Sequence, residues 1–372
     1  MDRANNINLR FEDYKNNGYL THNYHPYPAK FIPQLPAELI STLSQPGDLI
    51  LDPFMGSGTT LVEAKLSGRN AVGSDVNPLS CLVSRVKTTV LTAIEAKDAH
   101  KYARAAEEEV RSGVIHHPPS FQGVDKWFSK QAQVELAALL SVIRQVRSTQ
   151  VREFLEVAFS SIVVKASKQD SDTRYKAVEK NIAPFKIAEF FSSRVSDMTQ
   201  RMEQFRALAK STDSSIFLED ATARIPGGEM FHLAITSPPY MNSYDYYLYH
   251  KHRMNWLGMD YRGAQEAEFG SRNKHNDKNL GVEAYNVPIL NNAKLVFERL
   301  RKGGHYCIVV GDAILKGKLV TMNTNFDAIL TSVGFKKIRE IAFPQRKYTK
   351  TFTPGLRAVF KNSYVLIYRR VA

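Results

Sequence analysis

Residues 49–60 read LILDPFMGSGTT, and this stretch decides the fold of the chain. An apolar run ends in Asp52 and Pro53, turns through Gly56 and Gly58, and leads into a segment of helical composition. That order predicts a buried parallel strand, a tight loop and a helix. Glycines let backbone approach a ligand closely, and free N–H groups at a helix start favour an oxygen-rich or acidic ligand. By itself, the stretch predicts a ligand site at a strand–loop–helix junction.

The composition indicates a globular chain with a preference for polyanions. Of its 372 residues 43% are hydrophobic, and 50 lysines and arginines against 37 acids give a formal net charge of +13. The length suggests two domains, or one domain with a large insertion. The basic excess makes nucleic acid the leading partner, and the alternative is charge that serves solubility alone.

The two cysteines, Cys81 and Cys307, are far apart and lie in apolar surroundings. Their spacing argues against a disulfide framework or a zinc site, so we expect two buried small side chains and no metal. The first residues lack an apolar signal region, and no apolar run approaches the about 18 residues of a membrane span. These features predict a soluble, intracellular protein without a membrane partner.

Residues 1–36 contain no regular element that we can predict. Residues 1–20 are expected to be a mobile or loosely docked arm. Residues 21–36 are rich in proline and aromatic residues, and the prolines prevent a regular helix until about Ala37. This stiff segment, with Tyr27 and Phe31, forms either one wall of a pocket or an ordinary entry loop.

Strand–loop–helix units recur from residue 49 to residue 369, which predicts an α/β layered fold with a mostly parallel sheet. We expect helices at 37–43, over most of 78–114, and at 287–300 and 318–334. We expect strands at 49–51, 69–75, 214–220, 230–235, 305–311, 336–343 and 364–369. Ligands of such sheets gather at the carboxyl ends of the strands, so the residues that follow these strands should converge on one cleft.

Asp75 and Asp220 each end a predicted strand. Asp75 lies about one βαβ unit beyond the glycine loop, where a carboxylate can accept hydrogen bonds from both hydroxyls of a ribose. An acid at a strand end can equally be a helix cap. The distance from the glycine loop favours ribose binding for Asp75.

A long, basic helical tract at 130–205 interrupts the α/β pattern and is broken at residues 168–175 by short polar side chains. The break is either a loop that contacts phosphates and base edges or an exposed polar hinge. Residues 241–253 are dense in tyrosine and basic side chains, which suits stacking and backbone binding as well as core packing. Residues 262–281 are expected to be a flexible loop, and 345–361 a basic loop.

Two stretches, 52–60 and TSPPY at 236–240, together resemble the amino-group DNA methyltransferases, which methylate N4 of cytosine or N6 of adenine. The first resembles their methionine-binding motif and the second their catalytic DPPY/SPPY motif; residues 25–31 resemble the segment that packs on the cofactor. The resemblance covers about 21–85 and 214–369. It implies S-adenosylmethionine as cofactor, double-stranded DNA as substrate and a doubly wound, mostly parallel, Rossmann-like sheet with a helical insertion. It also implies a prokaryotic, cytoplasmic protein.

The resemblance assigns Asp75 to the ribose and Asp220 to the adenine amino group. Asp52 is expected to order the loop or to meet the methionine amino group. The predicted cofactor-binding residues are Tyr27, Ala29, Lys30, Phe31, Asp52, Pro53, Phe54, Gly56, Ser57, Gly58, Thr59, Thr60, Asp75, Asn77, Asp220, Ala221 and Thr236. The predicted catalytic residues are Ser237, Pro238, Pro239 and Tyr240. The predicted DNA-binding residues are Lys168, Arg174, Tyr175, Tyr244, Tyr246, Lys251 and Arg253.

The chemistry of amine methylation fits these residue types. The lone pair of an exocyclic amine is delocalised into the ring, so the amine is a poor nucleophile. The Ser237 hydroxyl and the Pro238 carbonyl can accept its hydrogens and favour a pyramidal nitrogen. Prolines 238 and 239 fix the backbone, and Tyr240 can stack on a base rotated out of the duplex. A rigid turn is the structural alternative for this segment.

In the enzymes that this chain resembles, serine before the double proline is typical of those that methylate N4 of cytosine, so the resemblance favours N4 of cytosine, with N6 of adenine as the alternative. An RNA guanine-N2 methyltransferase or a non-catalytic DNA-binding regulator is less favoured. We expect residues 21–114 and 213–372 to form the catalytic domain. Residues 115–212 are the expected target-recognition region, helped by 241–285. A cognate restriction endonuclease is a possible partner, and the oligomeric state is not predicted.

Overall fold

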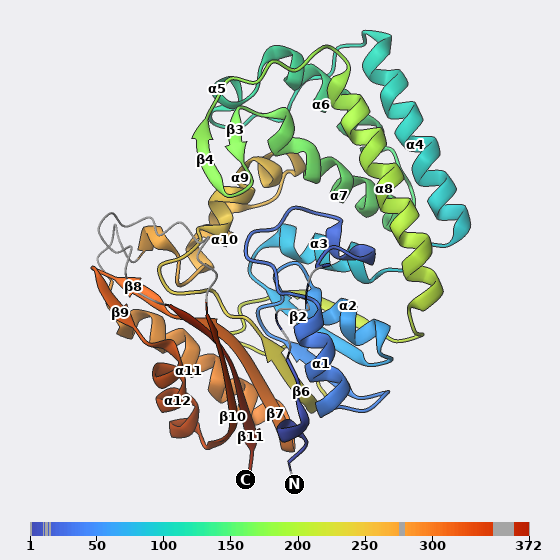
Figure 1. Cartoon of the computed structure of the whole chain (residues 1–372). Coiled ribbons are helices and arrows are strands. Elements are labelled where there is room, and N and C mark those ends of the chain that lie inside the picture. The colour runs from blue at the N-terminus through green and yellow to red at the C-terminus, as the bar shows by residue number, and fades with distance from the viewer. Residues whose placement is uncertain are drawn as a thin grey trace.

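The computed structural model describes residues 2–9, 11, 14, 16–274, 280–344 and 361–371. Its centre is a seven-stranded sheet (Figure 1) in the order β10-β11-β7-β6-β1-β2-β5. The strands are β1 (Leu49–Asp52), β2 (Asn70–Asp75), β5 (Ser214–Leu218), β6 (Phe231–Thr236), β7 (Leu300–Gly311), β10 (Phe335–Pro344) and β11 (Asn362–Arg370). Of these seven strands, β11 alone runs opposite to the rest: its pairs with β10 and β7 are antiparallel, and the pairs among β5, β2, β1, β6 and β7 are all parallel. The predicted mostly parallel, doubly wound sheet is confirmed.

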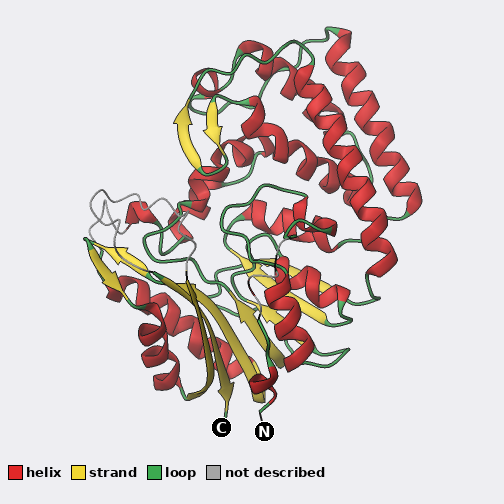
Figure 2. Ribbon diagram, viewed as in Figure 1, coloured by secondary structure: helices red, strands yellow, loops and turns green. Residues whose placement is uncertain are grey.

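Helices cover both faces of the sheet (Figure 2) because its strands alternate apolar residues between the two faces. Ile50 packs with α1 (Gln34–Leu43) and α2 (Thr59–Leu66) on one face. Leu51, the next residue, packs with α11 (Val282–Arg299) and α12 (Met322–Val333) on the other. The strand order reverses between β1 and β6, and a crevice opens at such a point at the carboxyl ends of the strands.

A second hydrophobic core holds the helical block together, above the sheet in Figure 1. The block comprises α4 (Ala93–Ser112), α5 (Val124–Trp127), α6 (Lys130–Arg144), α7 (Thr149–Ala166) and α8 (Lys186–Leu208). Three of these helices start at side-chain caps: Thr92 with Glu95 forms a capping box on α4, and Ser129 and Ser148 cap α6 and α7. Two helices link the block to the sheet, since α3 (Pro78–Thr88) and α9 (Tyr246–Leu257) both contribute side chains to this core.

Several expectations about individual segments are wrong. Residues 2–9 are docked rather than loose: Arg3–Asn6 forms a 3-10 helix, and Ala4 and Ile7 are buried. Asp2 accepts hydrogen bonds from His305 Nε2 and Arg369 Nη1, each at 2.9 Å. Residues 2–9 therefore dock through contacts with distant residues, which no local sequence pattern predicts.

Three further differences concern element boundaries. The first helix begins at Gln34 instead of 37, because Pro36 falls in its first turn, where a proline costs no helical hydrogen bond. Part of the expected loop 262–281 is α10 (Tyr261–Ala267), which Asp260 caps by accepting from Arg262 N and Gly263 N. The expected helix 318–334 starts at Met322, after the hairpin β8 (Ala313–Leu315) and β9 (Lys318–Val320).

The break predicted at 168–175 is confirmed, and it is a hairpin of β3 (Gln169–Ser171) and β4 (Arg174–Ala177). Both cysteines are buried and free, as expected. The basic loop expected at 345–361 lies almost wholly outside the described residues. Among the described helices, none combines the length and apolar character that crossing a membrane requires.

Candidate active site

A cleft of about 1370 Å³ lies at the carboxyl ends of β1, β2, β5 and β6. Most of the predicted site residues meet there. Those that line the cleft are Tyr27, Ala29, Lys30, Phe31, Pro53, Phe54, Gly56, Ser57, Thr59, Asp75, Asn77, Asp220, Ala221, Ser237, Pro239, Tyr240, Tyr244 and Tyr246. The segment at 27–31 therefore forms a wall of the cleft, which decides between the two alternatives for it.

Asp52 is buried beneath the cleft and joins its two motif-bearing strands. Its Oδ1 accepts a hydrogen bond from Thr236 Oγ1 at 2.8 Å and another from Phe54 N at 3.2 Å. Burial raises the pKa of this carboxyl to about 6, and the hydrogen bond from Thr236 opposes the rise. Neither Asp52 nor Thr236 lines the cleft, so Asp52 is placed to order the loop, one of its two predicted roles.

The glycine loop between β1 and α2 is fixed from behind by α3. Gly56 and Gly58 have φ of +50° and +72°. A Cβ on Gly58 would lie 2.8 Å from Ser84 Cβ and 3.1 Å from Ser84 Cα. From the same helix, Ser84 Oγ donates to Gly56 O at 3.0 Å and Lys87 Nζ donates to Ser57 O at 2.5 Å. No described side chain caps the start of α2, so no side-chain cap occupies its first N–H groups.

Asp75 fastens the loop to the end of β2. Its Oδ2 accepts from Gly56 N at 3.0 Å, and its Oδ1 accepts from Asn77 N at 2.8 Å. Burial raises the pKa of Asp75 to about 6, against the lowering effect of those hydrogen bonds. Each oxygen has a further lone pair, and the Ser80 hydroxyl also bonds to this carboxylate, so the carboxylate can still accept a donor from the cleft. Vicinal hydroxyls of a ribose are donors of that kind.

Aromatic side chains enclose the same end of the cleft. The Tyr27 hydroxyl lies 2.8 Å from Ser80 Oγ, and its ring approaches the Gly56 backbone. The Tyr27 ring is stacked with that of Tyr246, with centroids 6.0 Å apart. Asp220 also lines the cleft, just after β5, the strand beside β2, and its Oδ1 accepts from Thr222 N at 2.8 Å.

The TSPPY segment continues directly from β6 into the cleft. Tyr285 Oη donates to the Pro239 carbonyl at 2.8 Å, and Asn242 N donates to Gly270 O at 2.8 Å. Burial raises the pKa of Tyr240, and a hydrogen bond with the Ser237 side chain partly offsets that rise. Pro238 is buried and does not line the cleft. The segment is therefore held from the side by residues more than 25 positions further along the chain.

Glu268 is a cleft residue that the sequence reasoning missed. Its carboxylate accepts from Tyr246 N at 2.9 Å and Tyr247 N at 3.1 Å, which caps α9 from outside that helix. Burial raises the pKa of Glu268 to about 8. It stands in a polar stretch that lacks a motif, and only the fold of α10 brings it to the cleft, so the sequence carries no signal for it.

The predicted DNA-binding residues fall into different places. Tyr244 and Tyr246 line the cleft, and Lys251 Nζ lies 4.7 Å from the Tyr261 ring centroid. Lys168 and Arg174 belong to the β3–β4 region and pair with Glu179 and Asp170. One assignment needs correction. Arg253 is fully buried, so it is not placed to contact DNA. The Tyr175 ring is half-buried and stacks on His252 with centroids 5.3 Å apart, and its contact with DNA stays a prediction.

Residues 6–84 match the DNA methylase family. The match includes the glycine loop and Asp75 but ends well before TSPPY. The chain is 30% identical to Type II methyltransferase M.MvaI of Kocuria varians over 247 residues, which are 60% of this chain and 54% of M.MvaI. The chain thus spans about half the length of that relative.

Two other relatives complete the comparison. Type II methyltransferase M.BsoBI of Geobacillus stearothermophilus is 23% identical over 98% of this chain and 78% of its own length. DNA adenine methyltransferase YhdJ of Escherichia coli K12 is 41% identical over 59 residues, 16% of this chain and 20% of YhdJ.

The residues of the cleft fit S-adenosylmethionine, the cofactor that the sequence predicts and the DNA methylase match supports. Gly56 lines the cleft without a side chain, Asp75 offers acceptors for a ribose, and Tyr27 and Phe31 supply apolar walls. The individual roles of these residues stay predictions.

Proposed function

We propose that the chain methylates the exocyclic amino group of a base in double-stranded DNA, with N4 of cytosine as the favoured acceptor. The observation that carries the proposal is the hydrogen bond from Thr236 to Asp52, which ties the glycine loop to TSPPY. It supports the proposal because a cofactor-type loop and an amine-type acceptor site then share one cleft. Neither segment alone would suggest a methyl transfer.

The cofactor is assigned to the part of the cleft around β1 and β2. The glycine loop would hold its methionine portion, Asp75 its ribose, and Asp220 its adenine. S-adenosylmethionine, when bound, supplies an electrophilic methyl group. The surrounding backbone is fixed by Ser84, Lys87 and Asp52, so the site is organised before the cofactor enters.

The acceptor amine is assigned to Ser237 and its neighbours. The Ser237 hydroxyl accepts a hydrogen bond from the amine, which favours a pyramidal nitrogen with a lone pair free to react. Tyr240 stacks on a base that has left the duplex, since an amine inside the base stack cannot reach the cleft. The Tyr285 hydroxyl holds the Pro239 carbonyl and so keeps the segment in place.

Ser237 favours cytosine, because serine before the double proline is typical of the N4-cytosine enzymes that this chain resembles. The similarity to a DNA adenine methyltransferase over 59 residues favours N6 of adenine as the second candidate. Two relatives are named Type II methyltransferases, which supports a place in a restriction–modification system, with a cognate endonuclease as partner. A prokaryotic, cytoplasmic location stays a prediction.

The test is methyl transfer by the purified chain with labelled S-adenosylmethionine. The substrates are DNA from a strain without DNA methylation and, in parallel, bulk tRNA. Mass spectrometry of the hydrolysed products distinguishes N4-methylcytosine from N6-methyladenine and N2-methylguanine. N4-methylcytosine is the expected product. N6-methyladenine instead would show that adenine, the second candidate, is the base that is methylated. Label on tRNA alone, or tight DNA binding with no label, would overturn the proposal.

A further inference from the structure

The β3–β4 hairpin reaches from the helical block to the cleft. Ser171 pairs with Arg174, so Asp172 and Thr173 form a two-residue tip. Thr173 lines the same cleft as Asp75 and Ser237, although it is more than 60 residues away from Ser237 in the sequence. The tip of the hairpin therefore stands at the site where we propose that a base is methylated.

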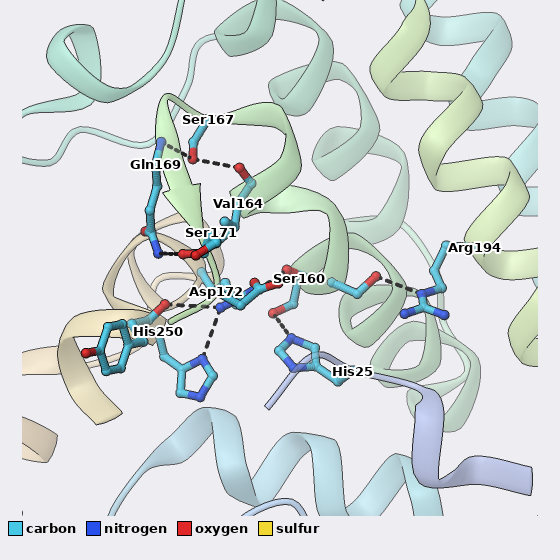
Figure 3. Close-up of polar contacts among 12 residues, drawn as sticks. His25, Ser160, Val164, Ser167, Gln169, Ser171, Asp172, Arg194 and His250 are labelled. Atoms are coloured by element: carbon cyan, nitrogen blue, oxygen red, sulfur yellow. Dashed lines mark hydrogen bonds and ion pairs between the residues drawn. The ribbon is translucent and has the colours of Figure 1, made fainter. Parts of the chain in front are cut away.

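The base of the hairpin is rigidly attached to the block. Lys180 Nζ donates to Val164 O at 3.0 Å and to Gln169 O at 2.5 Å. Ser167 Oγ donates to Val164 O and accepts from Gln169 N (Figure 3). The Tyr175 ring packs 4.5 Å from that of Trp127, measured between centroids. These contacts leave the strands little freedom to swing.

A buried arginine holds the tip. Arg253 of α9 is fully buried, and its Nη2 donates to the carboxylate of Asp172. Its Nε donates to Ser160 O of α7 at 3.0 Å, and its Nη1 donates to Tyr249 O at 3.1 Å. A buried guanidinium requires a counter-charge, and the Asp172 side chain, which is 39% exposed, supplies it.

The same arginine is connected to both halves of the cleft. The helix that carries it, α9, begins six residues after Tyr240 of the TSPPY segment. Ser160, whose carbonyl it contacts, also bonds through its hydroxyl to His25 Nε2 at 2.9 Å (Figure 3). His25 opens the segment that lines the cleft at 27–31. A shift of the hairpin tip would therefore be transmitted through these contacts to residues 27–31 and to α9.

The outer surface of the hairpin is polar and exposed. Ser171, Thr173, Arg174 and Lys176 are all exposed. The major groove of DNA admits a two-stranded β-ribbon, and hydroxyl and guanidinium groups are suitable readers of base edges there. The chain as a whole carries a net charge of +13, which favours a polyanion over a protein partner.

We propose that the β3–β4 hairpin reads the target sequence in the DNA groove and that Arg253, through Asp172, is the positioning residue that holds its tip over the cleft. The inference rests on the proposed function, since it takes DNA as the substrate. It names the element that determines which sequence reaches Ser237.

The first test replaces the exposed tip with Thr173→Ala combined with Arg174→Ala. Wild type and variant methylate genomic DNA from a methylation-free strain, and modification-aware sequencing gives the set of methylated sequences. We expect the preference for the wild-type sequence over single-base variants to fall about ten-fold or more, because a lost bidentate base contact discriminates at that level. Arg104→Ala, an exposed arginine on α4, is the matched control and should leave the set unchanged.

The second test is Asp172→Asn, which keeps the shape of the tip but removes the counter-charge of Arg253. We expect the KM for DNA to rise about ten-fold and the set of methylated sequences to broaden, with kcat on the best sequence lowered less than KM is raised. A merely structural role would lower the melting temperature without changing which sequences are methylated. If Asp172→Asn does not fold, the exposed tip variant alone decides.

The outcomes separate the two proposals. Wild-type protein that methylates no DNA would refute the proposed function itself. Wild-type protein that methylates DNA, with an unchanged set of sequences and an unchanged KM in both folded variants, would overturn the role of the hairpin. Binding of S-adenosylmethionine, measured by calorimetry, should stay within about two-fold in the tip variant, since its changes lie outside the assigned cofactor site.

Discussion

The two halves of the cleft are built in different ways. On the cofactor side, the loop after β1 is held by neighbours close in sequence, with Ser84, Lys87 and Asp75 all within 40 residues of it. On the acceptor side, TSPPY is held by Asp52, Tyr285 and the backbone of Gly270, which come from distant parts of the chain. The first half is a local motif with a rigid backing. The second half exists only when several remote segments have assembled.

The largest effect is expected from a variant that removes the hydroxyl assigned to the acceptor amine and leaves the cofactor side of the cleft unchanged. Ser237→Ala should lower methylation of DNA about 10²–10³-fold, the scale for one lost transition-state hydrogen bond. Affinity for S-adenosylmethionine should stay within about two-fold, since Ser237 is not among its assigned ligands. Initial rates and calorimetric titrations measure the two quantities. A Ser237→Ala enzyme with near wild-type rate would refute the role assigned to this hydroxyl.

The next effect tests the dependence of the acceptor half on a remote glycine. Gly270 has φ of +75°, and a Cβ there would lie 3.2 Å from Pro239 O and 3.3 Å from Tyr240 O. Gly270→Ala should therefore displace the TSPPY backbone and lower kcat by about 10- to 100-fold, since misplacement by about 1 Å can cost as much as the larger value.

Gly258→Ala is the matched control for that variant. Gly258 has φ of +71° but open space around its Cα, so its replacement adds backbone strain without a collision. Its kcat should stay near wild type, even if its melting temperature falls. Equal loss of kcat in the two variants would show that strain alone is responsible, and the contact of Gly270 with TSPPY would not matter.

A third variant asks whether the cofactor half is as rigid as its local contacts suggest. Gly58→Ala places a Cβ 2.8 Å from Ser84 Cβ and 3.1 Å from its Cα in α3, whereas Gly47→Ala, at φ of +88°, meets open space. Both variants carry the strain of positive φ, so their difference isolates the collision. We expect Gly58→Ala to be less stable than Gly47→Ala by about 1–3 kcal/mol, the usual cost of overpacking. Urea unfolding of both variants measures it, and equal midpoints would mean that the loop can move away from α3.

The same contrast explains what the sequence could predict. The strands of the seven-stranded sheet were predictable as segments, because most of them are apolar runs bounded by turn residues, which is a local pattern. Gly56, Asp75 and Ser237 were predictable because a sequence pattern places each one at the end of a strand or within a few residues after it. These are the parts of the site in which chain neighbours determine the position.

The parts that were not predictable depend on contacts between distant segments. The β3–β4 strands are short and polar, and they exist because Lys180 and Tyr175 attach them to helices. Arg253 looks like a DNA-binding residue in a basic, tyrosine-rich stretch, and only the packing of α9 against α7 makes it internal. Glu268 enters the cleft because α10 brings it to the start of α9. No window of neighbouring residues contains that information.

The smallest predicted effect compares two acids that burial affects alike. The pKa values of Asp52 and Asp75 are both raised to about 6, but only Asp75 lines the cleft. If Asp75 binds the ribose as a carboxylate, protonation of Asp75 must lower the affinity for S-adenosylmethionine. The affinity should therefore be constant above about pH 7 and fall as the pH drops through 6, by at most ten-fold per pH unit.

Calorimetric titration of S-adenosylmethionine between pH 5 and 7 tests this contrast in three proteins. Wild type should show the fall, and Asp75→Asn should bind more weakly with a flat profile, because its amide does not titrate in this range. Asp52→Asn should keep the fall, since Asp52 reaches the loop and Thr236 but not the cleft. A profile that flattens in Asp52→Asn and persists in Asp75→Asn would reverse the assignment. The affinity for the cofactor would then depend on how well Asp52 orders the glycine loop, and not on a hydrogen bond from the ribose to Asp75.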